Sequence, residues 1–221
     1  MTTRLVDLSH TITQGMTTYP GLPGPIICDY LSREASRKRY APGVEFQIGK
    51  LEMVANTGTY LDSPFHRYAE GKDLAGLPLD WMAGLDALKI RIPAGAPRAV
   101  DWKTFKGQVV RGKAVLVCTG WDRHWRTQAY GSANPFLTAD ACDGLREAGA
   151  RLVGIDSVNI DDLGDWARPA HSILLGADIP IVEHLCNLSA VPEGGARFFA
   201  VPPKVAGFGT FPVRAFVQTT A

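Results

Sequence analysis

The sequence has few cysteines and no excess of charge of either sign. Its four cysteines, Cys28, Cys118, Cys142 and Cys186, stand far apart and form no C-x-x-C pair. We therefore expect buried thiols rather than a disulfide framework or a zinc knuckle. The 23 basic and 22 acidic side chains leave a net charge of +1, with no block of like charges. Such a chain lacks the positive electrostatic field that would attract phosphate backbones or anionic lipid, so we expect neither nucleic acid nor a membrane as a partner.

Long apolar runs are also missing. No stretch approaches the roughly 20 apolar residues that a membrane-spanning helix needs, and the chain contains no internal repeat or low-complexity tract. We therefore expect a cytoplasmic protein. The 221 residues include no linker at which the chain would divide. Because domains usually run to roughly 100–200 residues, residues 1–221 are expected to form a single domain.

The second half of the chain predicts a β-α-β unit. Residues 114–118 form a continuous apolar run, which is typical of a strand that is buried on both faces and often parallel to its neighbours. Thr138 is suited to cap a helix that Gly149 would end, and residues 151–155 would form a second buried strand.

Further segments complete a mixed α/β sheet. A short helical segment at 170–175 precedes a third apolar strand at 179–182. Alternating apolar residues over 44–53 indicate a strand with a bend or bulge near its glycine. Two more strands are expected at 198–201 and 213–217. In such a fold the functional residues usually lie at strand ends.

The densest cluster of chemically active side chains spans residues 56–66. Asn56, Tyr60, Asp62 and His66 share this segment with a glycine turn and a rigid Ser-Pro step, which together would bring them to one centre. The residues alone leave a second interpretation open. In that alternative the segment is an ordinary turn, with Asp62 as a cap and His66 as a surface histidine.

A second cluster pairs His171 with Glu183. The histidine belongs to the expected short helical segment, and the carboxylate stands at the exit of a buried strand. Both would then reach the same edge of the sheet. Taken alone, the pair is better explained as a rim carboxylate and a capping histidine.

Taken together, the two clusters resemble the cyclase family of metal-dependent hydrolases, which includes bacterial kynurenine formamidase and isatin hydrolase. The resemblance covers nearly the whole chain. Its other landmarks are Asp7-Leu8-Ser9-His10, Tyr19-Pro20-Gly21, Val117-Cys118-Thr119-Gly120-Trp121, Pro135-Phe136-Leu137, Val153-Gly154-Ile155-Asp156-Ser157, Pro202-Pro203-Lys204-Val205 and Pro212-Val213-Arg214-Ala215. It implies an α/β fold with a mixed sheet, a single swivelling β/β/α domain, and a homodimer or homotetramer.

The family motif reads His-x-Gly-Thr-His-x-Asp-x-Pro-x-His, and it implies a role for each matching residue. In the family the first two histidines and the aspartate bind the metal, and the last histidine is the acid/base. By resemblance, Asp62 would be a metal ligand and His66 the catalytic acid/base. His171 and Glu183 match the family's remaining ligands.

The chain departs from this motif at two positions, where Asn56 and Tyr60 replace the ligand histidines. Imidazole supplies much of the binding strength for Zn²⁺ or Mn²⁺, whereas an amide is a weak neutral donor and a phenol must lose its proton to bind well. The retained set of Asp62, His171 and Glu183 would hold a cation loosely. A site without metal is the alternative.

The resemblance implies an arylformamidase-like hydrolase acting on C–N bonds other than peptide bonds. Water would be activated for attack on an aryl formamide or a cyclic amide such as a lactam, with His66 as acid/base. Asn56 would contact the substrate. Tyr19, Phe65 and Trp121 would form an apolar slot for a small, aromatic or cyclic substrate.

Two other functions stay open because of the replaced ligands. One is a metal-free cyclase, dehydratase or isomerase that uses His66 as base, Tyr60 as a hydrogen-bond donor, and the Asp62 and Glu183 carboxyls. The other is a catalytically inactive member that only binds a ligand.

Overall fold

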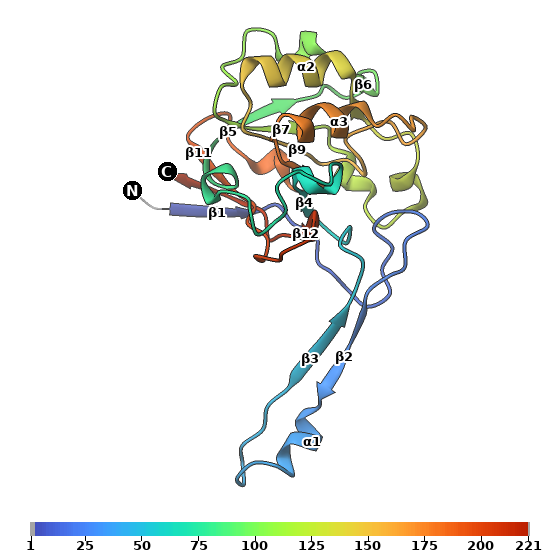
Figure 1. Cartoon of the computed structure of the whole chain (residues 1–221), viewed down its shortest axis with the longest axis vertical. Helices are drawn as coiled ribbons and strands as arrows, with labels where there is room; N and C mark the ends of the chain where they lie inside the picture. The colour runs from blue at the N-terminus through green and yellow to red at the C-terminus, as the bar shows by residue number, and fades with distance from the viewer. Residues whose placement is uncertain (1–2, 221) are drawn as a thin grey trace.

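A nine-stranded mixed sheet is the centre of the computed structural model, which describes residues 3–220 (Figure 1). The expected domain ends at residues 1 and 221 lie outside this range. In sheet order the strands are β1 (Thr3–Asp7), β13 (Phe216–Thr220), β11 (Ala196–Phe199), β5 (Ala83–Arg91), β7 (Ala114–Cys118), β9 (Leu152–Ile155), β10 (Ile181–Glu183), β4 (Tyr60–Asp62) and β12 (Thr210–Pro212).

The middle of the sheet is parallel, and its outer strands are antiparallel. β5, β7, β9 and β10 run parallel, whereas β4, β12, β11, β13 and β1 pair in the antiparallel sense. Every residue of β7 and β9 is buried. The continuous apolar run at 114–118 therefore belongs to a parallel strand covered on both faces, as predicted.

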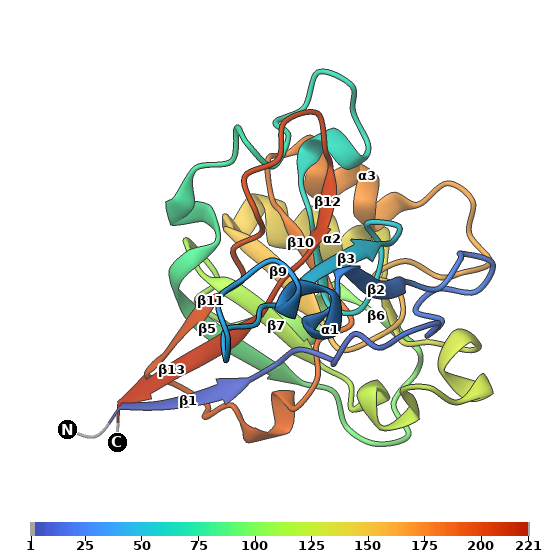
Figure 2. The same cartoon turned by 90° about the horizontal axis from the view of Figure 1, so that it is seen from below.

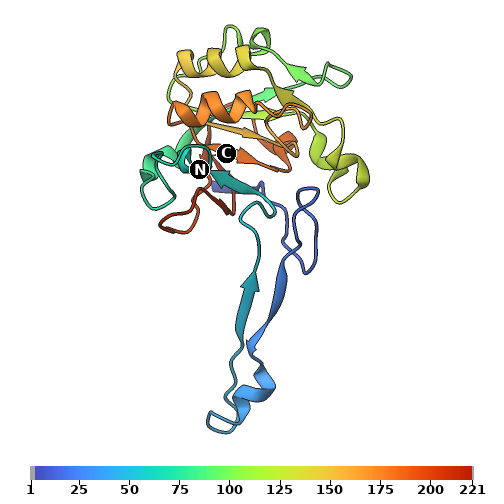
Figure 3. The same ribbon diagram turned by 45° about the vertical axis from the view of Figure 1, so that its right-hand side comes forward.

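Two helices cover one face of the sheet (Figure 3). The Thr138 side chain accepts a hydrogen bond from the Ala141 N–H at the start of α2 (Ala139–Ala148), and Gly149 ends the helix with φ 81°. Both helix ends confirm the sequence prediction. α3 (Pro169–Gly176) lies beside α2, and both pack on the odd-numbered side chains of β7.

The other face of the sheet is covered because the sheet curls on itself. On this face a cluster of buried apolar residues includes Val6 of β1, Leu61 of β4, Leu116 of β7 and Val217 of β13. Strands from both ends of the strand order therefore share one apolar interior. Figure 2 shows β1 and β13 side by side at one edge. Two short parallel strands, β6 (Ala99–Val100) and β8 (Phe136–Leu137), form a separate ladder.

An arm projects from the body of the molecule (Figures 1 and 3). It consists of β2 (Ile26–Leu31), the short helix α1 (Arg33–Arg37) and β3 (Ile48–Glu52). The strand expected at 44–53 is thus shorter than predicted. Its irregularity lies opposite Gly49, where the register of β2 shifts. All residues of β3 are exposed, so its alternating pattern serves no core within this chain.

Several other expectations are refined by the structure. The four cysteines are free; three are buried as expected, but Cys28 is exposed because it lies on the arm. The last two expected strands are shifted by a few residues, with β12 and β13 lying on either side of Val213. None of the described helices has the length and apolarity needed to cross a membrane.

Candidate active site

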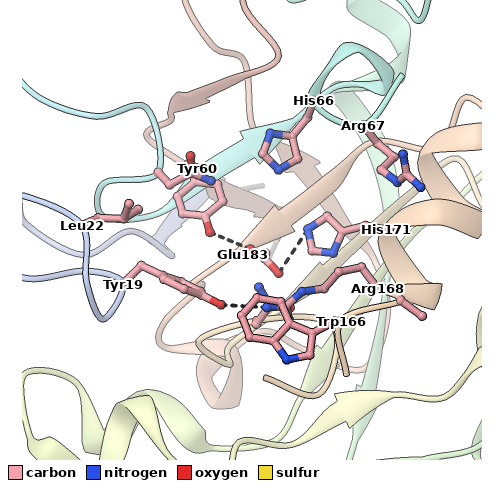
Figure 4. Close-up of a pocket in the computed structure, with 12 residues that line it drawn as sticks. Tyr19, Leu22, Tyr60, His66, Arg67, Trp166, Arg168, His171 and Glu183 are labelled. Carbon is pink, nitrogen blue, oxygen red and sulfur yellow. Dashed lines mark hydrogen bonds and ion pairs between the residues drawn. The ribbon is translucent and has the colours of Figure 1, made fainter. Parts of the chain in front are cut away.

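Antiparallel pairing of β4 with β10 unites the two sequence clusters. Glu183 lies directly opposite Tyr60, and Ile181 lies opposite Asp62. The Tyr60 hydroxyl donates to Glu183 Oε2 over 2.6 Å, although the two residues are 123 positions apart (Figure 4). The strand ends therefore bring both clusters to one site, as the sequence predicted.

His66 reaches the site from the short 3-10 helix Pro64–His66, which follows β4 directly. Its Nδ1 lies 3.7 Å from Asp62 Oδ1, and a third of its side chain is exposed. On the other side of β4, β12 places Thr210 opposite Asp62. Thr210 Oγ1 hydrogen-bonds both the Asp62 carboxylate and His66 Nδ1, the latter over 2.8 Å.

His171 is fixed in orientation at the start of α3. Its Nδ1 lies 2.6 Å from Asp161 Oδ2, and the same aspartate accepts hydrogen bonds from the backbone N–H groups of Ala170 and His171. His171 Nε2 lies 3.8 Å from Asp62 Oδ2 and 3.8 Å from Glu183 Oε1. Burial alone would lower the pKa of His171, but the Asp161 hydrogen bond and the nearby carboxylates raise it to about 9.

Glu183 and Tyr60 are each only 1% exposed. Glu183 Oε1 accepts the Ile160 N–H over 2.5 Å, and its other oxygen accepts the Tyr60 hydroxyl. Burial raises the pKa of the Glu183 carboxyl, and the charge of His171 partly offsets that rise. Burial, followed by the charges of Glu183 and Asp62, raises the pKa of Tyr60 well above 10. The phenol therefore stays protonated at neutral pH.

A histidine behind Tyr60 extends this hydrogen-bonded network. His184 Nε2 lies 3.3 Å from the Tyr60 oxygen, and its Nδ1 lies 2.9 Å from the Tyr130 hydroxyl. Burial, with a smaller effect of His10, lowers the pKa of His184 to about 3, so the imidazole is neutral. The single hydroxyl proton of Tyr60 is already donated to Glu183. Its expected role as a hydrogen-bond donor to substrate would therefore require this bond to open.

The donor atoms fit one divalent cation. Asp62 Oδ2 is buried and has no hydrogen-bond partner within residues 3–220, which is costly for a carboxylate oxygen unless a cation neutralises it. Ligand atoms of Asp62, His66 and His171 all lie within 4.8 Å of one another. A carboxylate and imidazole nitrogens suit Zn²⁺ or Mn²⁺. The protonated Tyr60 adds no charge to this set.

A pocket of about 390 Å³ opens over these groups (Figure 4). Its lining includes six residues that the sequence singled out: Tyr19, Asn56, Tyr60, His66, His171 and Glu183. Two other expected substrate contacts lie outside the lining. Phe65 is half-buried beside His66, and the Trp121 indole donates to the Tyr130 carbonyl.

Several residues of the site carried no signal in the sequence. Arg67, Trp166 and Arg168 line the pocket, whereas Asp161 and Thr210 support its histidines from behind. The loop before α3 looks like an ordinary surface loop in the sequence, and nothing local marks Asp161 as the partner of the His171 imidazole ten residues later.

The chain matches proteins of known family along its length. A family model described as "Putative cyclase" matches residues 6–162. A curated kynurenine formamidase from Bacillus anthracis is 30% identical over 225 residues, which is 98% of this chain and 98% of the relative.

Solved structures share the fold. Isatin hydrolase A from Labrenzia aggregata, bound to benzyl benzoate, superposes with a TM-score of 0.82 at 23% identity, covering 99% of this chain and 94% of that chain. A structure described as a potential metal-dependent hydrolase with cyclase activity gives 0.79 at 24% identity and covers all of both chains. The mixed, curled sheet is therefore common to these proteins and to this chain.

Proposed function

Because the chain belongs to the cyclase family, we propose that it hydrolyses a C–N bond in an aryl formamide or a cyclic amide. The observation that carries this proposal is the meeting of His66, His171 and Glu183 at one pocket, with the buried Asp62 carboxylate 3.7 Å from His66 and 3.8 Å from His171. The curated relatives named kynurenine formamidase support an amide substrate.

His66 is proposed as the acid/base. It is the most exposed of the four grouped side chains, so its imidazole is the one that a water and a substrate nitrogen can both approach. As base it takes a proton from the attacking water, and as acid it returns a proton to the leaving nitrogen. Asp62 and Glu183 lie deeper and are almost fully buried.

A divalent cation is proposed as the cofactor, with Zn²⁺ or Mn²⁺ as the candidates. Asp62, His171 and Glu183 would hold it, since His171 Nε2 lies 3.8 Å from both carboxylates. When bound, such a cation polarises an amide carbonyl and lowers the pKa of water. His171 must release its proton to become a ligand, and the hydrogen bond to Asp161 then keeps its Nε2 directed at the site.

The pocket favours an aromatic amide that carries a negative charge. Arg67 and Arg168 line it, and the Arg168 guanidinium is held by neutral oxygens: Asn159 Oδ1, the Asp162 carbonyl and the Tyr19 hydroxyl. A planar guanidinium with free N–H groups suits a carboxylate. Trp166, 88% exposed at the pocket, offers a face for an aromatic ring.

Hydrolysis assays test this function. We expect purified protein, supplied with Zn²⁺ or Mn²⁺, to hydrolyse N-formylkynurenine, isatin or a member of a lactam panel, and His66→Ala to abolish that activity while the fold persists. His124→Ala is the matched control, because His124 lies outside the pocket lining. Normal turnover by His66→Ala would mean that His66 is only structural. Thermal shifts by these compounds without any turnover would favour a binding protein instead.

The arm supports a homo-oligomer, a homodimer or homotetramer. It exposes Ile27, Tyr30, Phe46, Ile48 and Leu51, each by 46% or more. A two-stranded ribbon is marginally stable alone, and a contiguous exposed apolar patch marks an interaction surface. We therefore propose that the arm packs on a second copy of this chain.

Light scattering after size-exclusion chromatography tests the role of the arm. Leu51→Asp together with Phe46→Asp is expected to shift the protein toward monomer. Val109→Asp is a control at a residue that is 70% exposed on the body. An unchanged mass for the arm variant would remove the arm from the interface.

We also propose that the protein works in the cytoplasm. All four cysteines are free thiols, which fits a reducing compartment.

A further inference from the structure

Thr210 links the candidate acid/base to a buried carboxylate. The residue is 3% exposed and lies on β12. Its single hydroxyl group contacts both the Asp62 carboxylate and His66 Nδ1. The same hydroxyl therefore has to serve two neighbours, and it has only one proton to give.

The chemistry of the two neighbours decides where that proton goes. A carboxylate only accepts hydrogen bonds, whereas a hydroxyl has one donor and two lone pairs. Asp62 therefore takes the Thr210 proton, which leaves the Thr210 oxygen as an acceptor toward His66. Nδ1 must then be the protonated nitrogen, because the hydrogen bond at one ring nitrogen sets the state of the other. The lone pair of His66 lies on Nε2.

We propose that Thr210 is a positioning residue that holds His66 as the Nδ1–H tautomer and leaves Nε2 free as the base. The catalytic consequence rests on the proposed hydrolase function; the tautomer itself does not.

The backbone makes this arrangement rigid. β12 pairs with β4 so that Thr210 lies opposite Asp62, and the Gly209 carbonyl accepts the Ser63 N–H over 2.7 Å. A Cβ at Gly209 would lie 2.5 Å from the backbone nitrogen of His66, so the two segments touch through backbone atoms. The hydroxyl and the imidazole therefore have little freedom to separate.

The first test reads the tautomer directly. In metal-free protein with ¹⁵N-labelled histidine, the ring shifts of His66 are expected to show a protonated Nδ1 and an unprotonated Nε2 at a pH where the ring is neutral. Thr210→Val is expected to lose this pattern, and Thr210→Ser to keep it. A wild-type ring protonated at Nε2 would overturn the proposal, even in a protein with no detectable hydrolase activity.

The second test uses kinetics on whichever amide the wild type hydrolyses. Thr210→Val is expected to lower kcat about 10- to 100-fold, as loss of such supporting partners does, with KM within about twofold of wild type. Thr210→Ser should recover most of the rate. Equal kcat for Thr210→Val and wild type would refute the role.

Two controls separate this role from a general structural one. Thr57→Val removes another buried hydroxyl, which donates to the Val54 carbonyl, and should leave the His66 ring shifts unchanged. Metal content should be equal in wild type and Thr210→Val, because a loss of metal through Asp62 would also lower kcat; a rate loss that follows metal loss alone would count against the proposal. If Thr210→Val fails to fold, Thr210→Ala removes the same hydroxyl with less bulk, and the same tautomer change is required.

Discussion

Gly209→Ala should disturb the candidate active site through backbone contact alone. An added Cβ would meet the His66 nitrogen at 2.5 Å, the His66 Cα at 2.6 Å and the Phe65 carbonyl carbon at 3.0 Å. All three are backbone atoms, so no flexible side chain can swing away. Overpacking of this kind typically costs about 1–3 kcal/mol. For a chain of this size, that corresponds to a fall in Tm of roughly 2–12 °C.

The same clash should also displace His66. A misplacement of about 1 Å is enough to lower a rate by roughly 100-fold, so kcat for any amide substrate should fall far more than the loss of folded protein explains. Thermal unfolding and steady-state kinetics on one preparation measure both effects. Gly194→Ala is the matched control, because nothing lies within 4 Å of its added Cβ. If Gly209→Ala matches Gly194→Ala in both Tm and kcat, the close approach of this segment to His66 is refuted.

Three further predictions follow from the site and its surroundings. Because Asn56 and Tyr60 stand at two ligand positions of the family motif, the proposed cation should bind weakly, and wild type purified without chelator or added metal should hold far less than one Zn or Mn per chain by elemental analysis. Asn56→His with Tyr60→His should bind metal roughly tenfold or more tightly; Tyr30→His, on the exposed arm, is the control, and a full equivalent in wild type would contradict weak binding. Arg168→Met should raise KM by roughly 10- to 100-fold for a carboxylate-bearing amide but not for its methyl ester, and equal effects on both would rule out the proposed ion pair. Burial lowers the pKa of His10 to about 4 from 6.5, so the stability that this residue contributes above pH 6.5 is lost as the pH falls toward 4. Between pH 7 and 5, the free energy of unfolding, measured in urea, should fall by about 1 kcal/mol more for wild type than for His10→Phe, after allowance for the partial exposure of His10. Equal falls in the two proteins would contradict this prediction.

The functional residues that local patterns revealed are those whose chemistry is encoded in short segments. Asp62 and His66 stand in one motif, and His171 and Glu183 in another, so their types and spacing are visible without a fold. The parallel strands at 114–118 and 151–155 were equally predictable, because burial on both faces leaves a continuous apolar run. The ends of α2 were marked by Thr138 and Gly149, whose capping depends on only a few neighbouring residues.

The tertiary structure decided how those residues are supported and what surrounds them. Thr210 contacts His66 across 144 positions only because β12 pairs beside β4, and no local pattern encodes that pairing. The enclosed Tyr60–Glu183 bond likewise depends on strand register, which long-range packing sets. In the arm, the local pattern was read correctly but its surroundings were not predictable. The alternating apolar residues predicted a strand, whereas the exposure of that strand away from the body is fixed by the path of the whole chain.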